Sequence, residues 1–215
     1  MSDIRNIKKP TYQKMFWLFI AGSLLGVLIE GVWYYFMHGH WETHVVSIWG
    51  DFCIIYGLGA VGYYIGNYAM QGKNIFLRFI VFMLIGTGVE FICGIVLKYC
   101  LNMRAWTYKG YAFSFMDMIC LKMAVIWGIA GILFGYLIPG IDKMLTLTEG
   151  RTKDIVCVIF SVFMTVNFIL TGICLVRWKQ RRENVPPQNS FFSRIDEKYG
   201  DDYMKQRFIE WRFLS

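Results

Sequence analysis

The sequence predicts an all-α protein, a polytopic transmembrane helical bundle with about five spans. Hydrophobic residues make up 56% of the chain and charged residues only 17%, whereas about a quarter of the residues of a soluble domain are charged. The charged residues also avoid five windows, each longer than the roughly 20 apolar residues that a helix needs to cross a bilayer core. Helices are the expected form, because lipid offers backbone N–H and C=O groups no other partner.

The five windows follow one another with short connections and contain between zero and three charged residues each. They are Met15–Met37, Ile48–Met70, Ile75–Leu101, Phe113–Pro139 and Ile155–Val176. The first follows a basic segment, as the core of a signal peptide would, but it is too long for one and no small-x-small cleavage site follows it. We therefore expect the first window to remain as a membrane helix.

These spans divide the chain into four segments. We expect a cytoplasmic N-terminal segment at residues 1–14, a repeated four-helix membrane core at 15–145, a fifth transmembrane helix at 155–177 and a polar, amphipathic tail at 178–215. Apolar and charged residues alternate in the tail, which favours a solvated or interfacial helix. On the fifth span, Asn167 and Thr171 share a face, as do Ser161 and Thr165, and these residues are expected to form interhelical hydrogen bonds.

Lysine and arginine are distributed unevenly between the ends of the expected spans. The positive-inside rule favours a cytoplasmic N-terminus, because the loop from His38 to Ser47 contains neither residue type. Five spans would then leave the C-terminus outside, although four basic residues directly follow the last span. A re-entrant segment at Ala105–Met116, an unusual fifth span or a tail that breaks the rule would each resolve this conflict.

The first four spans read as two copies of one helical hairpin in the same orientation, which is a parallel repeat. Each copy has a glutamate on a helix face of small residues, then an aromatic loop, an acidic residue, a cysteine and an aromatic-glycine pair. The small-residue faces, which allow another helix to approach closely, are Gly22, Gly26 and Glu30 in one copy and Gly86, Glu90 and Gly94 in the other.

Glu30 and Glu90 are the leading candidates for a substrate- or ion-binding site. An ionised carboxylate in the middle of a membrane helix costs about 2.5–3.5 kcal/mol on insertion scales, so such residues usually face the bundle interior and serve a function. The structural alternative is a glutamate that is hydrogen-bonded to a neighbouring helix or paired with Lys122.

Four further residues join this candidate site because they occupy matching places in the two hairpins. Tyr56 and Trp127 belong to the aromatic-glycine pairs, and Asp51 and Asp117 precede the second helix of each hairpin. The two aspartates are equally compatible with ordinary charges at the membrane interface.

All three histidines of the chain, His38, His40 and His44, lie in one short loop together with Glu42. In an extended segment these side chains would point to one side, where imidazole and carboxylate groups can bind Zn, Cu or Ni. The spacing matches no zinc signature, and a solvated loop explains it equally well.

Several classes of protein are excluded or disfavoured. The chain has no Walker A loop, so it does not itself hydrolyse ATP by that route. It also has no GxSxG, HExxH or kinase signature, which favours a protein that is not an enzyme. Its six cysteines include no CxxC pair, which disfavours a disulfide framework or zinc ribbon. The net charge of +7 belongs to loops and tails that touch lipid headgroups, and nucleic acid is not an expected partner. No cofactor can be named.

The motifs of both hairpins resemble the CmpB-like family, named putative type IV ABC-transporter permease. The resemblance covers roughly residues 12–145, and where the family tends to have prolines this chain has Asp51 and Ile54. The family name implies a permease that works with a separate ATPase chain. The segments that carry the resemblance are Gly22–Gly26 with Glu30, Gly50–Gly59, Glu90, Trp106–Tyr108, Asp117–Leu121 and Trp127-Gly128.

Together these observations favour a multi-pass cell-membrane protein that transports a small solute or ion. Its partners would be membrane lipid and either an ATPase subunit or further copies of the chain. An intramembrane enzyme acting on a lipid or quinone, with a glutamate as general base, is one alternative. A structural or regulatory membrane partner is another, and it would have no cavity at the glutamates.

Overall fold

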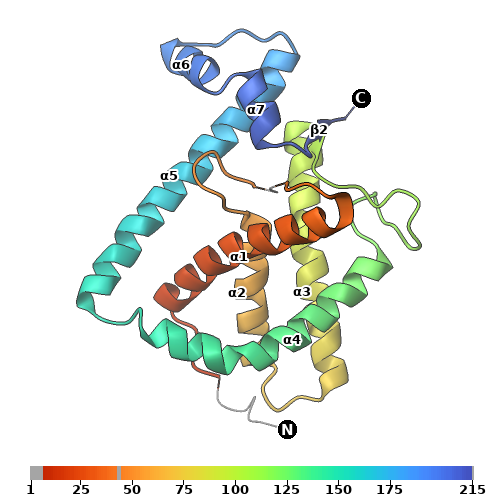
Figure 1. Cartoon of the computed structure of the whole chain (residues 1–215), viewed down its shortest axis with the longest axis vertical. Helices are drawn as coiled ribbons and strands as arrows, with labels where there is room; N and C mark the ends of the chain where they lie inside the picture. The colour runs from red at the N-terminus through yellow and green to blue at the C-terminus, as the bar shows by residue number, and fades with distance from the viewer. Residues whose placement is uncertain (1–6, 43–44, 215) are drawn as a thin grey trace.

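The structure, a computed structural model, describes residues 7–42 and 45–214, and within them four helices are long and apolar enough to cross a membrane (Figure 1). Only 22–33% of their most apolar windows is buried inside the protein, so most of this surface can face lipid. The chain is thus an all-α polytopic bundle, as predicted. The four helices are α1 (Tyr12–His38), α3 (Ile75–Ile95) with its π-helical continuation η1 (Val96–Cys100), α4 (Leu121–Thr146) and α5 (Arg151–Arg182).

The second expected span forms a shorter helix, α2 (Ile54–Ala69), of 16 residues. The first six residues of that window form a turn, in which Gly50 has a φ of 71° and the Ser47 hydroxyl donates to the Gly50 carbonyl at 2.9 Å. About five expected spans therefore correspond to four full-length helices and one that is about one turn short of a bilayer core.

The fourth expected span begins later than the window of apolar residues indicates. Helix α4 starts at Leu121 instead of Phe113, because three non-glycine residues before it have a left-handed backbone. These residues are Phe113 (φ 52°), Met116 (φ 54°) and Asp117 (φ 61°). Apolar composition alone could not distinguish this loop from the helix that follows it.

Helices α1 and α2 pack as one hairpin and α3 and α4 as a second, and glycines permit their close approach. A Cβ atom at Gly22 would lie 2.7 Å from Cβ of Ala60, and one at Gly86 would lie 2.5 Å from Cβ of Trp127. Helix α2 also contacts α3 and α4, which joins the hairpins.

One end of the bundle is held by polar contacts around the start of α1. Buried Asp142 of α4 accepts hydrogen bonds from the Tyr64 hydroxyl at 2.5 Å and from the Lys8 amide at 3.2 Å. Lys14 of α1 forms an ion pair with Glu149 at 3.3 Å. The N-terminal segment thus lies beside the α4–α5 connection.

The opposite end is covered by the C-terminal tail, which contains α6 (Ser190–Lys198), α7 (Asp201–Arg207) and β2 (Arg212–Phe213). Strand β2 pairs antiparallel with β1 (Met103–Arg104), and Met204 and Phe208 are buried. This result differs from the expected solvated or interfacial helix, because the apolar face of the tail packs against the end of α5 and the loops beside it.

The Ser161 hydroxyl of α5 accepts a hydrogen bond from the Tyr12 hydroxyl of α1 at 2.8 Å, whereas Asn167 and Thr171 of α5 bind a loop. Asn167 accepts a hydrogen bond from the Trp49 amide at 3.0 Å and donates one to the Trp49 carbonyl at 2.8 Å. Thr171 accepts from the Ile48 amide at 2.9 Å. The expected interhelical bond thus forms at Ser161, and Asn167 and Thr171 instead link α5 to the connection from α1 to α2.

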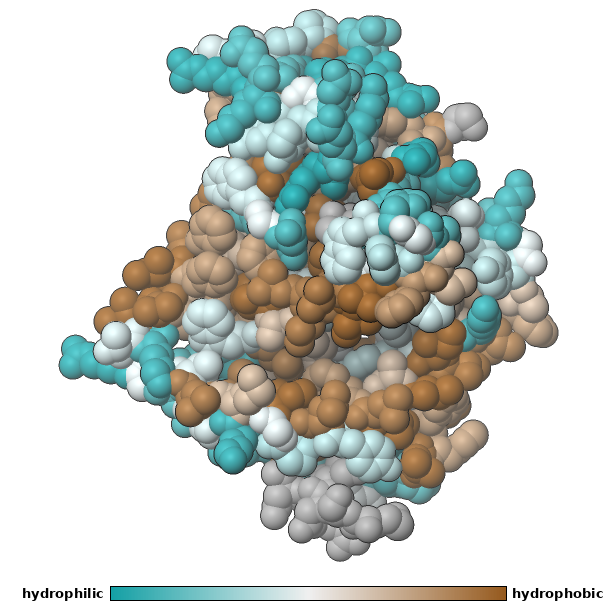
Figure 2. Space-filling model, in the orientation of Figure 1, coloured by the Kyte–Doolittle hydropathy of each residue, from teal (hydrophilic) through white to brown (hydrophobic). Residues whose placement is uncertain are grey.

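The distribution of hydropathy agrees with a membrane protein. Figure 2 shows apolar residues across the middle of the visible face, over α1, α4 and α5, and hydrophilic residues over α6 and α7 at one end. A further group of hydrophilic residues lies near the α4–α5 connection. An apolar belt between polar ends is the pattern that a bilayer requires.

Candidate functional site

A cavity of about 610 Å³ lies between the two hairpins, α5 and the C-terminal tail. This volume falls within the roughly 300–1,000 Å³ range that is typical of small-molecule sites. Its lining comes from α1, the starts of α2 and α4, α3 with η1, the loop after β1, α5 and the segment after α7. The cavity is therefore assembled from residues throughout the chain.

Glu90 lies in this cavity, and both of its carboxylate oxygens accept hydrogen bonds. The Tyr108 hydroxyl donates to Oε1 at 2.5 Å, and the indole Nε1 of Trp127 donates to Oε2 at 3.1 Å. Gly86 lies one turn before Glu90 on α3 and leaves room for Trp127 to pack against the helix. Only 6% of Glu90 is exposed, so these two donors replace much of the hydration that the carboxylate would have in water.

Glu30 lines the same cavity from α1 and interacts with Tyr56 of α2. The Tyr56 ring packs directly over Gly26, one turn before Glu30, where a Cβ atom would clash with the ring. Cys53 and Cys93 complete this part of the wall. In each hairpin a glycine one helical turn before the glutamate thus leaves room for an aromatic ring to pack against the helix.

The charged side chains on the described part of the cavity wall are all acidic. Among the described residues that line it, the charged side chains are Glu30, Glu90 and Glu210, and none is basic. Aromatic rings form much of the remaining wall, including those of Tyr56 and Trp127. This combination of carboxylates and ring faces favours positive charge inside the cavity.

The structure brings together four of the six residues expected at a substrate or ion site and leaves two elsewhere. Glu30, Glu90, Tyr56 and Trp127 line the large cavity, but Asp51 and Asp117 do not. Asp51 lies at the surface, where its Oδ1 is 3.1 Å from Nη1 of Arg207.

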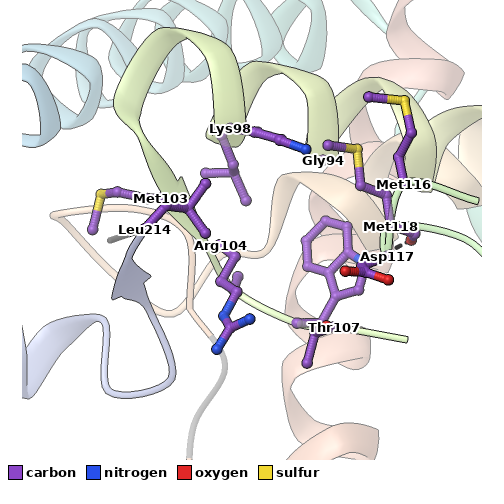
Figure 3. A pocket seen from close by; sticks show the side chains of 12 residues that line it. Gly94, Lys98, Met103, Arg104, Thr107, Met116, Asp117, Met118 and Leu214 are labelled. Atoms are coloured by element: carbon purple, nitrogen blue, oxygen red, sulfur yellow. Dashed lines mark hydrogen bonds between the residues drawn. The ribbon is translucent and has the colours of Figure 1, made fainter. Parts of the chain in front are cut away.

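Asp117 lines a separate pocket of about 80 Å³ beneath β1. Figure 3 shows Lys98, Arg104 and Asp117 around this pocket, which Trp106 also lines. The Trp106 Nε1 donates to the Met118 carbonyl at 2.9 Å. The aspartates therefore belong to the loops that surround the cavity.

His38 and His40 lie outside the cavity. His38 is the last residue of α1, its ring stacks on Tyr34 at 4.1 Å between centroids, and His40 Nε2 is 3.7 Å from a Glu42 oxygen. His44 falls outside the described residues. Within the described part of the chain no three His, Cys, Asp or Glu side chains are placed to hold a metal ion, and the metal site remains a prediction.

Sequence reasoning missed Tyr108 and Glu210 as residues of this cavity. In the sequence Tyr108 is one residue of the aromatic segment Trp106–Tyr108, and no local pattern indicates that its hydroxyl binds Glu90 directly. Glu210 lies in the tail, near Phe208 and Trp211, which also line the cavity. Lys122, considered as a partner for the glutamates, instead places its Nζ 5.7 Å from the centre of the Tyr111 ring.

The fold is that of a polytopic helical membrane protein with an internal cavity that Glu30, Glu90 and Glu210 line. Residues 17–172, more than two thirds of the chain, match the family described as "Putative ABC-transporter type IV" (ABC_trans_CmpB), and the chain belongs to this family. This result confirms the resemblance found in the hairpin motifs and extends it through much of α5. Comparisons with curated proteins and with solved structures each found no significant match.

Proposed function

We propose that this chain is the membrane-embedded component of a transporter for a small solute or ion, which binds between the two hairpins. The observation that carries this proposal is the single cavity of about 610 Å³ that Glu30 and Glu90 both line. Carboxylates at membrane depth commonly mark substrate and ion pathways. Non-helical backbone such as the loop around Tyr108 is tolerated at such depth where it lines a cavity.

Matching contacts in the two hairpins support an internal repeat, which we propose together with this assignment. Gly26 leaves room for the Tyr56 ring in the first hairpin, and Gly86 does the same for Trp127 in the second. Each glycine lies one helical turn before a glutamate. The glycine that follows each of these aromatic residues contacts a phenylalanine, and the pairs are Gly57 with Phe19 and Gly128 with Phe79. Substrate sites of many transporters lie at the interface between structural repeats.

Membership of the family supports a separate ATPase subunit as a partner, which would supply the energy for transport. We place the chain in the cell membrane as a multi-pass protein with the N-terminus and the α4–α5 connection on the cytoplasmic side. Lys14, Lys143 and Arg151 lie at this end of the bundle. At the other end, Arg177 and Arg181 are already paired with Asp196.

Flux measurements in proteoliposomes test this function. A panel of labelled organic cations, anions and neutral solutes would be screened with the purified chain, with and without the ATPase encoded nearest to it. For any solute that crosses, Glu30→Gln and Glu90→Gln should each lower the initial rate, whereas Glu183→Gln, at the exposed end of α5, should not. Unchanged flux in both cavity variants would contradict the role assigned to the two glutamates.

An intramembrane enzyme is the second candidate, because the rim of the cavity includes exposed apolar residues. Ile92 and Val96 on the α3 side and Val176 on α5 are exposed and also line the cavity. A lipid or quinone could enter past them from the bilayer. Product formation in detergent, without a sealed compartment or a gradient, would favour this alternative over transport.

A further inference from the structure

The cavity has a rim, a wall and charges that together indicate the class of ligand it accepts. The rim residues Ile92, Val96 and Val176 are apolar, exposed and located on helices that can face lipid. A molecule that is already dissolved in the bilayer can therefore reach the cavity without crossing a polar surface. Hydrophilic solutes would have to enter from the end that the tail covers.

The backbone at the rim is locally irregular. Val96 and Cys100 belong to η1, a π-helical turn that continues α3, and both line the cavity. Single π-helical turns within α-helices occur frequently at functional sites, since they widen the helix and turn side chains that regular geometry would point elsewhere. This turn contributes to the wall of the cavity instead of only to helix packing.

The wall selects for positive charge. Glu30, Glu90 and Glu210 line it, and none of the other described lining residues is charged. The tail contributes Phe208 and Trp211 beside Glu210, and the hairpins contribute Tyr56 and Trp127. Aromatic faces attract cations, most strongly where water is excluded, and aromatic cages recognise quaternary ammonium groups.

We propose that the ligand is a lipophilic organic cation that enters from the bilayer between α3 and α5 and binds with its charge toward Glu30 and Glu90. This substrate class rests on the proposed function in one respect, namely that the same cavity is the transport site. A volume of about 610 Å³ accommodates a body of several apolar groups around one cationic centre. The observations thus favour a bulky amine, ammonium or phosphonium compound over an anion.

A pair of probes with matched shape and opposite charge tests the proposal. Tetraphenylphosphonium and tetraphenylborate have nearly the same size, so binding of each to the full chain in nanodiscs, measured by equilibrium dialysis against empty nanodiscs, isolates the effect of charge. We expect the cation to bind roughly tenfold or more tightly than the anion. Equal binding of the two probes, or tighter binding of the borate, would overturn the proposal.

Variants of the chain locate the binding. Glu30→Gln and Glu90→Gln together should weaken tetraphenylphosphonium binding by about tenfold or more, and the matched control Glu183→Gln should leave it unchanged. An unchanged affinity in the double variant, with an elution profile like that of the natural chain, would contradict the proposal. A Glu90→Asp variant that keeps the charge should retain more of the affinity than Glu90→Gln.

A second readout follows a natural cysteine of the cavity and so does not depend on folding of a variant at Glu30 or Glu90. Cys93 lines the cavity and is partly exposed, and its rate of maleimide labelling can be followed by mass spectrometry. Tetraphenylphosphonium should slow this labelling, but it should not slow labelling of a control cysteine placed by Glu183→Cys. Equal rates at Cys93 with and without the cation would count against binding in this cavity.

Transport and substrate class can fail separately. If tetraphenylphosphonium binds and protects Cys93 but no cation, including membrane-impermeant tetraethylammonium, crosses proteoliposomes, the substrate class stands and the transport function is contradicted. If the liposome panel instead identifies an anion or neutral solute whose flux depends on Glu30 and Glu90, transport stands and the substrate class is overturned.

Discussion

The hydroxyl of Tyr108 lies 2.5 Å from Oε1 of Glu90 and ties the loop between α3 and α4 to the buried carboxylate. The Trp127 indole holds the other oxygen from α4. Glu90 of α3 is thus hydrogen-bonded both to α4 and to the loop that joins α3 to α4. The same contacts hold the carboxylate at the wall of the large cavity, so the residue that we propose to bind the ligand also has a structural role.

Removing the Tyr108 hydroxyl tests how much its hydrogen bond to Glu90 stabilises the fold. Tyr108→Phe should lower the free energy of unfolding by about 1–2 kcal/mol, since a hydrogen bond to a partly buried carboxylate is lost. Thermal unfolding in detergent, followed by tryptophan fluorescence, measures the change. Tyr99→Phe on the exposed face of η1 serves as the control and should leave the midpoint unchanged. A midpoint for Tyr108→Phe equal to that of the natural chain would argue against a stabilising bond.

Glycines on one helix should differ sharply in their tolerance of a methyl group. A Cβ atom at Gly86 would lie 2.5 Å from Cβ of Trp127, whereas one at Gly88 would meet nothing within 4 Å. Gly86→Ala should therefore push α3 and α4 apart, with a loss of about 1–3 kcal/mol. Gly88→Ala should be neutral or slightly stabilising because alanine is the better helix former. The ratio of folded to aggregated protein after heating compares the two, and equal losses would contradict the close contact.

Arg207 of α7 binds the C-terminal tail to the loop between α1 and α2, next to the cavity. Its Nε donates to the Ser47 carbonyl at 2.9 Å, its Nη1 lies 3.1 Å from Oδ1 of Asp51, and Phe208 follows directly in the cavity wall. Arg207→Ala should loosen this end, so that Cys93 reacts faster with maleimide and the tail is cleaved faster by trypsin. Asp51→Asn should have a smaller effect, since exposed ion pairs contribute only about 0–1 kcal/mol. Identical labelling of Cys93 in both variants and the natural chain would show that the tail is held by other contacts.

Asp196 should make docking of the tail sensitive to acid. Burial acts to raise the pKa of Asp196, but hydrogen bonds from Arg177 (2.6 Å) and Arg181 (2.5 Å), together with their charges, outweigh burial and lower the pKa below its ordinary value. A lowered pKa in the folded state stabilises the tail above the unfolded pKa of about 3.9. This stabilisation is lost as the pH falls below about 4 through the lowered folded pKa.

Hydrogen exchange of α6 and α7 measured between about pH 3 and 6, corrected for intrinsic exchange rates, follows this effect. The natural chain should lose protection of the tail at the acid end of this range. Asp196→Asn should already show reduced protection at neutral pH and little further loss on acidification. A tail that remains equally protected at both ends of the pH range in the natural chain would contradict the role of this carboxylate.

The membrane class, the approximate positions of the spans and the family motifs could all be read from the sequence, because each depends on local composition. Charged residues are costly in lipid, so their absence from long windows marks helices, and the rare exceptions Glu30 and Glu90 stand out. The boundaries were less predictable. The left-handed backbone at Met116 and Asp117 and the turn around Gly50 occur within apolar stretches, and hydropathy does not distinguish them from helix.

The sequence by itself determined that this chain is a helical membrane protein of a recognisable family, with two isolated glutamates in small-residue helix faces. Only the tertiary structure decided that both glutamates line one cavity, that Asp51 binds Arg207 instead, and that Glu210 and Trp211 form part of the wall. The reason is physical. Asp51 and Arg207 are separated by 156 residues, and a contact at that distance depends on how all the intervening helices pack, which no local pattern of apolar and charged residues records.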